Sequence, residues 1–316
     1  MGLFSRKNNY AELMAISLTA EGLYSACVLE RENALPELEF LSFYPKAALP
    51  WETLLERLVR ESPAKRKRRS LLLRTGDYQI IALDTIGVPP EEMKDALRWR
   101  IKDMLDFPVD EASFDAIHIP GDVNAGGRNA SMLAIVAKSQ TIARHQMQFQ
   151  DTKLPLEIID IPEMAQRNIS ARLEPSGRGL AMLSFDESGG LLTVSFGGEL
   201  YLSRRLDLNL QMVQNTVHSE QATAFERVSL EVQRSLDHFD RQHNYITTAK
   251  LLIAPMGAAA TQLQEFLSNN MYLPVEVLNL ADVLDLSKLP QLQSPDQQQA
   301  YFRVIGAAMR LLNGAA

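Results

Sequence analysis

Apolar residues follow two spacings along this chain of 316 residues, and each spacing predicts one kind of element. Apolar runs bounded by turn residues predict strands, whereas apolar positions three and four residues apart predict helices. The clearest amphipathic segment is "AFERVSLEVQRSLDHF", whose apolar face consists of Phe225, Val228, Val232, Leu236 and Phe239. Strands and helices alternate along most of the chain, and this order predicts an α/β fold.

Two segments share a strand, turn, strand pattern. The first is "LMAISLTAEGLYSACVLE" and the second is "AMLSFDESGGLLTVSFGGEL". Aligning them places Ser17 on Ser184 and Gly22 on Gly189, and similar elements follow each segment. A repeated unit of this size, in a chain long enough for about two domains, predicts an internally duplicated protein.

Turn-rich segments suggest where the domains meet. The segment "EPSGRG" ends a helical pattern, so we expect a first domain at 1–179 and a second at 180–316. Within the first, residues from approximately 77 to 155 read as strand, helix, strand, strand, helix, which indicates an inserted small subdomain. The helix of this subdomain should begin at Pro90, since proline suits the first helical turn.

Composition narrows the classes of function. A formal net charge of −7 gives no general attraction to nucleic acid, so we expect no nucleic-acid partner. The single cysteine, Cys27, fits a reducing compartment and a structural place on a strand. The start of the chain does not resemble a secretory signal, and no apolar run is long enough to span a membrane. These features predict a cytoplasmic protein that reaches a membrane through a partner or through the weak basic patch "KRKRR" at 65–69, which could equally be a solvated turn.

Two groups of side chains are candidates for a site outside the hairpins. His238, Asp240 and His243 suggest a metal site, but the two histidines lie about 140° apart around a helix, so we expect a solvated helix end. Arg98 and Trp99 lie off the apolar face of their helix and are candidates for partner contact, with packing between subdomains as the alternative.

The order of elements resembles the actin-like ATPase superfamily, in the branch of PilM, the cytoplasmic assembly protein of type IV pili. The segment "MKDALRWRIKDMLDFPVDEASFDAIHIP" looks like the inserted subdomain of that branch, and "YFRVIGAAMRLL" resembles its closing helix. This resemblance implies an α/β, two-domain actin-like (ribonuclease H-like) fold with a PilM-type inserted small subdomain. It also implies that a closing helix at 300–313 packs back on the first domain. Among the members of the branch, the chain resembles the MshI type of the mannose-sensitive haemagglutinin (MSHA) pilus.

The resemblance also implies a nucleotide cleft, in which this chain departs from the family. Where the family has an aspartate in each phosphate loop, this chain has Ser17 and Ser184. Thr19 and Asp186 replace glycines that would let backbone amides approach phosphate. Neutral hydroxyls supply neither the charge nor the hard oxygen that Mg²⁺ prefers, so metal affinity should be low.

The turn that would hold the adenosine is altered as well. Only Gly257 remains of its expected glycines, and Met256 could fill the space of the base. Three losses in one cleft predict a pseudo-ATPase with no catalytic residues, no metal and no cofactor. The alternative is an active ATPase that uses Mg-ATP with Glu21, Asp186 and Glu187 as replacement acids.

By the same resemblance, the partner would be a PilN-like bitopic protein of the inner membrane, whose short cytoplasmic tail lies in a groove of the first domain. Binding an extended peptide needs no nucleotide chemistry, so loss of the loops is compatible with this role. The protein would then link the membrane complex indirectly to the assembly motor. A filament-forming structural protein is a third possibility.

Overall fold

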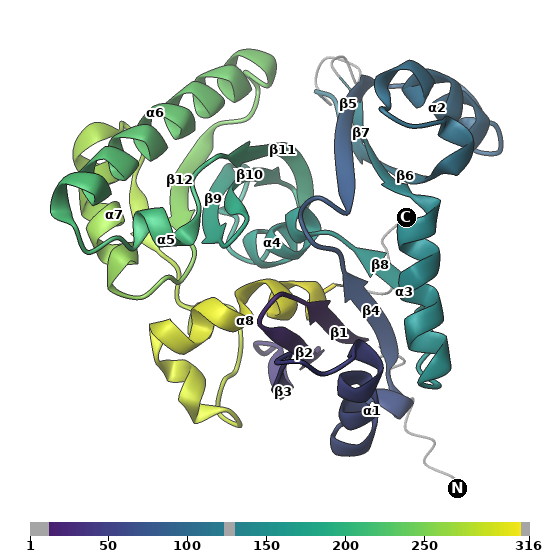
Figure 1. Ribbon diagram of the computed structural model, residues 1–316. Helices are drawn as coiled ribbons and strands as arrows, with labels where there is room; N and C mark the ends of the chain where they lie inside the picture. The colour runs from purple at the N-terminus through teal and green to yellow at the C-terminus, as the bar shows by residue number, and fades with distance from the viewer. Residues whose placement is uncertain (1–12, 123–129, 311–316) are drawn as a thin grey trace, which may run out of the picture.

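The computed structural model describes residues 13–122 and 130–310, which form three β-sheets with helices around them (Figure 1). The N-terminal basic pair and the end of the predicted helix 300–313 therefore lie outside the described residues. The first sheet has the order β3-β2-β1-β4-β8 and the second has the order β11-β10-β9-β12-β13. The strands of the first sheet are β1 (Leu13–Leu18), β2 (Gly22–Leu29), β3 (Glu37–Pro45), β4 (Arg68–Leu72) and β8 (Ile158–Asp160). Those of the second are β9 (Gly179–Asp186), β10 (Gly189–Phe196), β11 (Glu199–Leu206), β12 (Thr248–Ile253) and β13 (Val275–Val277).

The two large sheets share one topology, which confirms the repeat predicted from the hairpins. In each, three antiparallel strands are followed by two parallel ones. Ser17 pairs with Tyr24 and Ser184 pairs with Leu191, both close to the hairpin turn. The third strands, β3 and β11, were not predicted, although "ELEFLSFYP" is rich in strand-forming residues and two glycines precede "ELYLSRRL".

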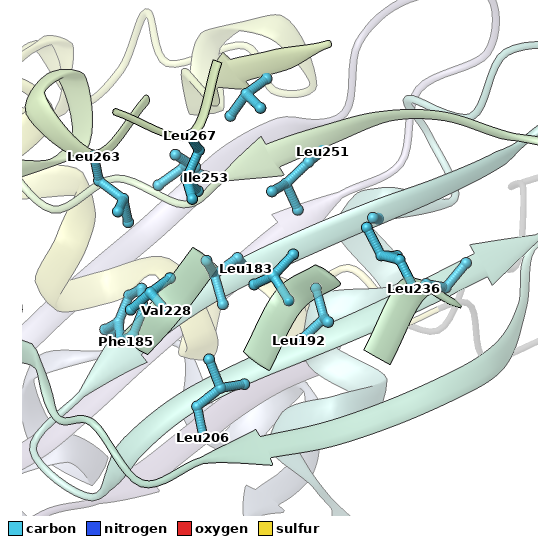
Figure 2. Packing of buried hydrophobic residues seen from close by; sticks show 14 of the residues in the cluster. Leu183, Phe185, Leu192, Leu206, Val228, Leu236, Leu251, Ile253, Leu263 and Leu267 are labelled. Carbon is cyan, nitrogen blue, oxygen red and sulfur yellow. The ribbon is translucent and has the colours of Figure 1, made fainter. Parts of the chain in front are cut away.

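The second sheet packs against α6 (His218–Gln242) and α7 (Ala258–Asn270), with α5 (Leu210–Val213) beside them. All five residues of the predicted apolar face of α6 are buried, as predicted. Figure 2 shows this core, where side chains of α6 and α7 meet those of the central strands. Its labelled residues are Leu183, Phe185, Leu192, Leu206, Val228, Leu236, Leu251, Ile253, Leu263 and Leu267.

Two helices lie between the large sheets. Helix α8 (Pro295–Ala308) packs on β1 and β2, α4 (Pro162–Ser170) packs on β9 and β10, and the two helices contact each other (Figure 1). The helices cross closely at Gly306, where an added Cβ would lie 2.3 Å from the carbonyl oxygen of Ala165. Asn168 Nδ2 also donates to the Gly306 carbonyl at 2.9 Å. A side chain at position 306 would therefore force apart the two helices that join the domains.

We predict that Gly306→Ala lowers the free energy of unfolding by about 2 kcal/mol, because overpacking a close helix crossing displaces backbone. Gly87→Ala is the matched control, since no atom lies within 4 Å of its added Cβ. Urea unfolding followed by circular dichroism measures both variants. Equal stability of the two variants would contradict the close contact between α4 and α8.

The glutamine-rich segment "LPQLQSPDQQQ" at 289–299 has the polar composition of a connector, but most of it is helical. Residues Pro290–Gln293 form a 3₁₀ helix, and helix α8 starts at Pro295. Gln298 is fully buried. Its polar atoms are satisfied there, because its oxygen accepts from the Leu280 amide at 2.9 Å and its nitrogen donates to the Leu292 carbonyl at 2.8 Å. Polar composition alone could not indicate that the Gln298 side-chain amide forms hydrogen bonds with buried backbone groups.

The third sheet has the order β5-β7-β6 and forms a small unit with α2 (Met93–Ile101). Its strands are β5 (Tyr78–Asp84), β6 (Ala112–Ile119) and β7 (Ser131–Lys138). One face packs on Leu97 and Ile101 of α2, whereas the other face places Ile119 and Leu133 in the core of the second domain. The small sheet is thus held between its own helix and the second domain.

The two helices of this unit differ from the sequence prediction. Helix α2 begins at Met93 rather than Pro90, because Pro90 belongs to a turn whose carbonyl accepts the Met93 amide. The helix ends in a 3₁₀ turn at Lys102–Met104, which leaves Met104 53 % exposed. Helix α3 (Ser139–Asp151) places Phe149 in the core of the first domain, with α1 (Trp51–Glu61).

Candidate functional site

A cavity of about 920 Å³ lies between the two large domains. It is lined by the β1–β2 turn, the β9–β10 turn, the end of β4, the α5 region and one side of α8. Six residues singled out from the sequence line it: Ser17, Thr19, Glu21, Ser184, Asp186 and Glu187. Gly257 is not among the lining residues, although Ala254 and Pro255 just before it are.

Ser184 is bonded to the helix that joins the domains. Its hydroxyl is buried, 3 % exposed, and donates to Gln166 Oε1 of α4 at 2.6 Å. The amide nitrogen of Gln166 donates to the Met182 carbonyl at 2.7 Å and to Thr193 Oγ1 at 2.9 Å. These bonds fix the orientation of the Gln166 amide, so that its oxygen faces position 184. A side chain at position 184 therefore has to be a neutral hydrogen-bond donor to fit this environment.

Asp186 is occupied by interactions within the protein. Its Oδ1 accepts from the backbone amides of Ser188 at 2.8 Å and Gly189 at 3.1 Å, which closes the β9–β10 turn. Its Oδ2 forms an ion pair with Arg303 of α8. Burial lowers the pKa of Arg303, while the charge of Asp186 opposes that shift. The carboxylate therefore links the second hairpin to α8.

The first hairpin is also closed by its own side chains. Thr19 Oγ1 lies 3.2 Å from the Gly22 carbonyl, and Tyr24 donates to Glu21 Oε2 at 2.5 Å. Burial and then the bond to Glu21 raise the pKa of Tyr24. Glu187, the remaining acid of the two turns, is exposed. Among residues 13–122 and 130–310, no group of three or more His, Cys, Asp or Glu side chains is placed to hold a metal ion.

A buried carboxylate beside the cavity was missed by the sequence analysis. Glu163 of α4 is fully buried and accepts from Arg205 of β11 at 2.5 Å and from Tyr78 of β5. Arg205 also donates to Thr75 Oγ1 at 2.6 Å. Burial and the charge of Glu163 raise the pKa of Tyr78. This network joins α4, the second domain and the inserted unit, and no local pattern around any of its members indicated it.

The turn before α7 differs from the expectation for Met256. The Met256 side chain is buried in the core of the second domain and does not line the cavity, so it does not fill space there. Gly257 has a φ of 65°, which favours glycine, and its added Cβ would lie 2.4 Å from Asp296 Oδ1 of α8. Gly257 therefore allows the close approach of α8.

Trp99 is exposed on α2, with 74 % of its surface accessible. Lys102 Nζ lies 5.4 Å from the ring centroid, and neighbouring Arg98 forms an ion pair with Asp110. This exposure contradicts the alternative in which Trp99 packs between subdomains. Its contact with a partner stays a prediction.

Three residues of the basic run at 65–69 form ion pairs within the protein. Lys67 is buried and pairs with Glu39, while Arg68 and Arg69 pair with Glu157 at 2.9 and 2.8 Å. A fully solvated turn is therefore wrong for this segment, because Lys67 is buried, whereas the basic patch for lipid stays a prediction. The ion pairs join β4 to its neighbours, and their acids are distant in sequence.

His243 is also not part of a solvated helix end, because it is 1 % exposed. Its ring lies 5.3 Å from that of Tyr201 and 5.1 Å from that of Phe239, and its Nδ1 is 3.2 Å from Tyr245 Oη. Burial, and then the charge of His238, lower its pKa. Helical position alone could not predict that the chain beyond α6 covers this ring.

We predict that the protein loses stability as pH falls from 7.5 to 5.5, partly through His243. Its folded pKa lies below the unfolded value of 6.5, so the stabilisation is complete above that value and is lost below it. His243→Phe should remove about 1 kcal/mol of this pH-dependent loss, as measured by urea unfolding at both pH values. Buried His145, whose pKa is also lowered by burial, should retain its part. Exposed His118→Gln, on β6, is the control, and an equal effect of the two substitutions would contradict this assignment.

No helix in the described part of the chain combines the length and apolar character needed to cross a membrane. Residues 1–12, 123–129 and 311–316 are outside this statement.

Comparison with known proteins shows the fold. No protein-family model and no curated protein matches the chain. A solved structure of the PilM-PilN type IV pilus biogenesis complex matches with a TM-score of 0.69 and 17 % identity, over 96 % of this chain and 100 % of the matched chain.

Two other solved structures match less well. One is a Bacteroides thetaiotaomicron protein with an actin-like ATPase fold and unknown function, with a TM-score of 0.48 and 11 % identity over 92 % of this chain and 99 % of that one. The other is the cytoplasmic domain of EpsL, an inner membrane component of the type II secretion system of Vibrio cholerae, with a TM-score of 0.46 and 11 % identity over 83 % and 97 %. Taken with the repeated sheet topology, the similarity to the PilM-PilN structure confirms the predicted fold: this chain has a two-domain actin-like fold.

Proposed function

We propose that this protein is a cytoplasmic scaffold, peripheral to the inner membrane, in the assembly complex of a type IV pilus. It binds the cytoplasmic tail of a PilN-like bitopic membrane protein and links that complex indirectly to the assembly motor. Within this class we propose an MshI-like role in an MSHA-type pilus. The fold similarity to a structure of the PilM-PilN complex, over nearly the whole of both chains, supports the choice of partner.

The state of the cavity supports a scaffold rather than an ATPase, and the ion pair between Asp186 and Arg303 is the observation that carries this proposal. A carboxylate that neutralises a partly buried guanidinium is poorly available to a metal ion. Ser184, the other candidate in this hairpin, donates a hydrogen bond to Gln166 Oε1. The residues present therefore do not fit Mg²⁺, and no hydrolytic step is assigned to them.

The replacement acids of an active ATPase are also poorly placed. Glu21 accepts the hydroxyl of Tyr24, Asp186 is paired, and Glu187 is exposed. A Mg²⁺ site built from these acids could form only after two internal interactions were broken, Tyr24 with Glu21 and Arg303 with Asp186. The cavity itself persists, but Ser184 and Asp186 bond the second hairpin to α4 and α8.

Co-purification with the membrane partner tests the proposed function. The protein is co-expressed with the PilN-like protein encoded in the same pilus system, either intact or without its cytoplasmic tail. We expect the intact partner to co-purify in detergent without added nucleotide and the truncated partner to be lost. Retention of the truncated partner at full yield would refute the tail as the point of contact.

A further inference from the structure

A second groove, of about 800 Å³, separates the inserted small unit from the second domain. One wall is the β5 edge of the small sheet with the end of α2, and the other wall is β11 with α6. Its apolar lining includes Leu83, Ile119, Leu133 and Leu202. The groove is separate from the cavity between the large domains, because no residue lines both.

Two unpaired strand edges face this groove. Within the described residues, β5 pairs only with β7 and β11 only with β10, so each lies at the edge of its sheet. The two strands are close at one end, where Arg205 of β11 donates to Tyr78 of β5 at 2.5 Å. Further along the two strands, the groove is lined by Ala82, Leu83 and Asp84 of β5 and by Tyr201, Leu202, Ser203 and Arg204 of β11. An exposed strand edge is a template for an added extended strand.

The rim of the groove is rich in arginine, although the whole chain is acidic. Arg100, Arg204, Arg234 and His238 line it, together with the acids Asp84 and Glu231. Glu231 is already paired with Arg234 at 3.6 Å. Arg100 and Arg204 are exposed and form no ion pair with another described residue.

We propose that this groove binds an extended peptide segment of a partner protein, with acidic side chains directed toward Arg100 and Arg204. The backbone of the segment pairs with the free edge of β5 or β11, its apolar side chains lie on Ile119, Leu133 and Leu202, and its carboxylates meet the two arginines. The proposal goes beyond the tail-binding function, which is assigned to the first domain. A bound segment here would fix the position of the small unit against the second domain.

The test uses a capped, fluorescein-labelled peptide of alternating valine and glutamate, about as long as β11 with its 8 residues. Control peptides replace glutamate by lysine, or alternate residues by proline, which cannot pair fully with a strand edge. At physiological ionic strength, we expect fluorescence anisotropy to show the glutamate peptide binding at least about tenfold more tightly than either control.

Variants of the intact protein locate the interaction. The double substitution Arg100→Glu and Arg204→Glu should weaken binding of the glutamate peptide by about tenfold or more. Arg227→Glu, at an exposed position of α6 outside the groove, is the matched control and should change the affinity by less than about twofold. All three positions are exposed, so the variants should keep the unfolding midpoint of the parent protein.

Hydrogen exchange then identifies the strand. Bound glutamate peptide should slow amide exchange within 78–84 or 199–206. Equal binding of the peptides, equal loss in Arg227→Glu, or protection confined to the cavity between the large domains would overturn the proposal. The co-purification of the membrane partner would be unaffected by those results, so the two proposals fail separately.

Discussion

Ser184→Asp should lower the free energy of unfolding by about 3 kcal/mol, even though it restores the residue type of an actin-like phosphate loop. The new carboxylate would be buried against Gln166 Oε1, an acceptor, so two acceptors would face each other without a proton. Turning the Gln166 amide would break its bonds to the Met182 carbonyl and Thr193. We expect the loss in urea unfolding at neutral pH.

Ser17→Asp is the matched control for this substitution. Ser17 has the corresponding place in the first hairpin, lines the same cavity and is only partly buried. Its substitution should cost less than about 1 kcal/mol, because water can reach the carboxylate. If Ser184→Asp unfolds at the same urea concentration as the parent, position 184 is not the closed, neutral site described above.

Arg205→Met should cost about 3 to 5 kcal/mol, since it leaves the fully buried Glu163 without its cation. Methionine keeps most of the side-chain volume, so the loss reports chiefly on the charge. The bond to Tyr78 remains, but a phenol cannot neutralise a carboxylate. Thermal and urea unfolding measure this effect.

The neighbouring Arg204→Met is the control, because Arg204 is exposed and should contribute less than about 0.5 kcal/mol. Adding Glu163→Gln to Arg205→Met should recover at least about half of the loss, since the buried charge is then removed. A loss below about 1 kcal/mol for Arg205→Met alone would show that Glu163 does not depend on this arginine.

The fold was largely predictable because it depends on local patterns that recur twice. In the hairpin carrying Ser17 and in the hairpin carrying Ser184, a glycine begins the second strand, and the apolar face of α6 is periodic over its length. The third strand of each sheet was missed, since β3 and β11 follow the hairpins without a helix to separate them.

The site was less predictable, because its partners come from distant parts of the chain. Asp186 is paired with Arg303 and Glu163 with Arg205, and neither pair has a local spacing that reveals it. The same holds for the basic run, where Lys67 is buried through Glu39. Sequence reasoning located Ser184 beside the cavity, but only the tertiary structure shows that Gln166 holds it.

The central claim is that this actin-like protein works as a scaffold without a functional Mg-nucleotide site. Thermal unfolding with and without millimolar Mg-ATP tests it most directly, because a ligand that binds only the folded state raises the midpoint by mass action. We predict the same midpoint under both conditions. A rise that requires both Mg²⁺ and ATP would contradict the claim and show that the cavity containing Ser17 and Ser184 still binds nucleotide.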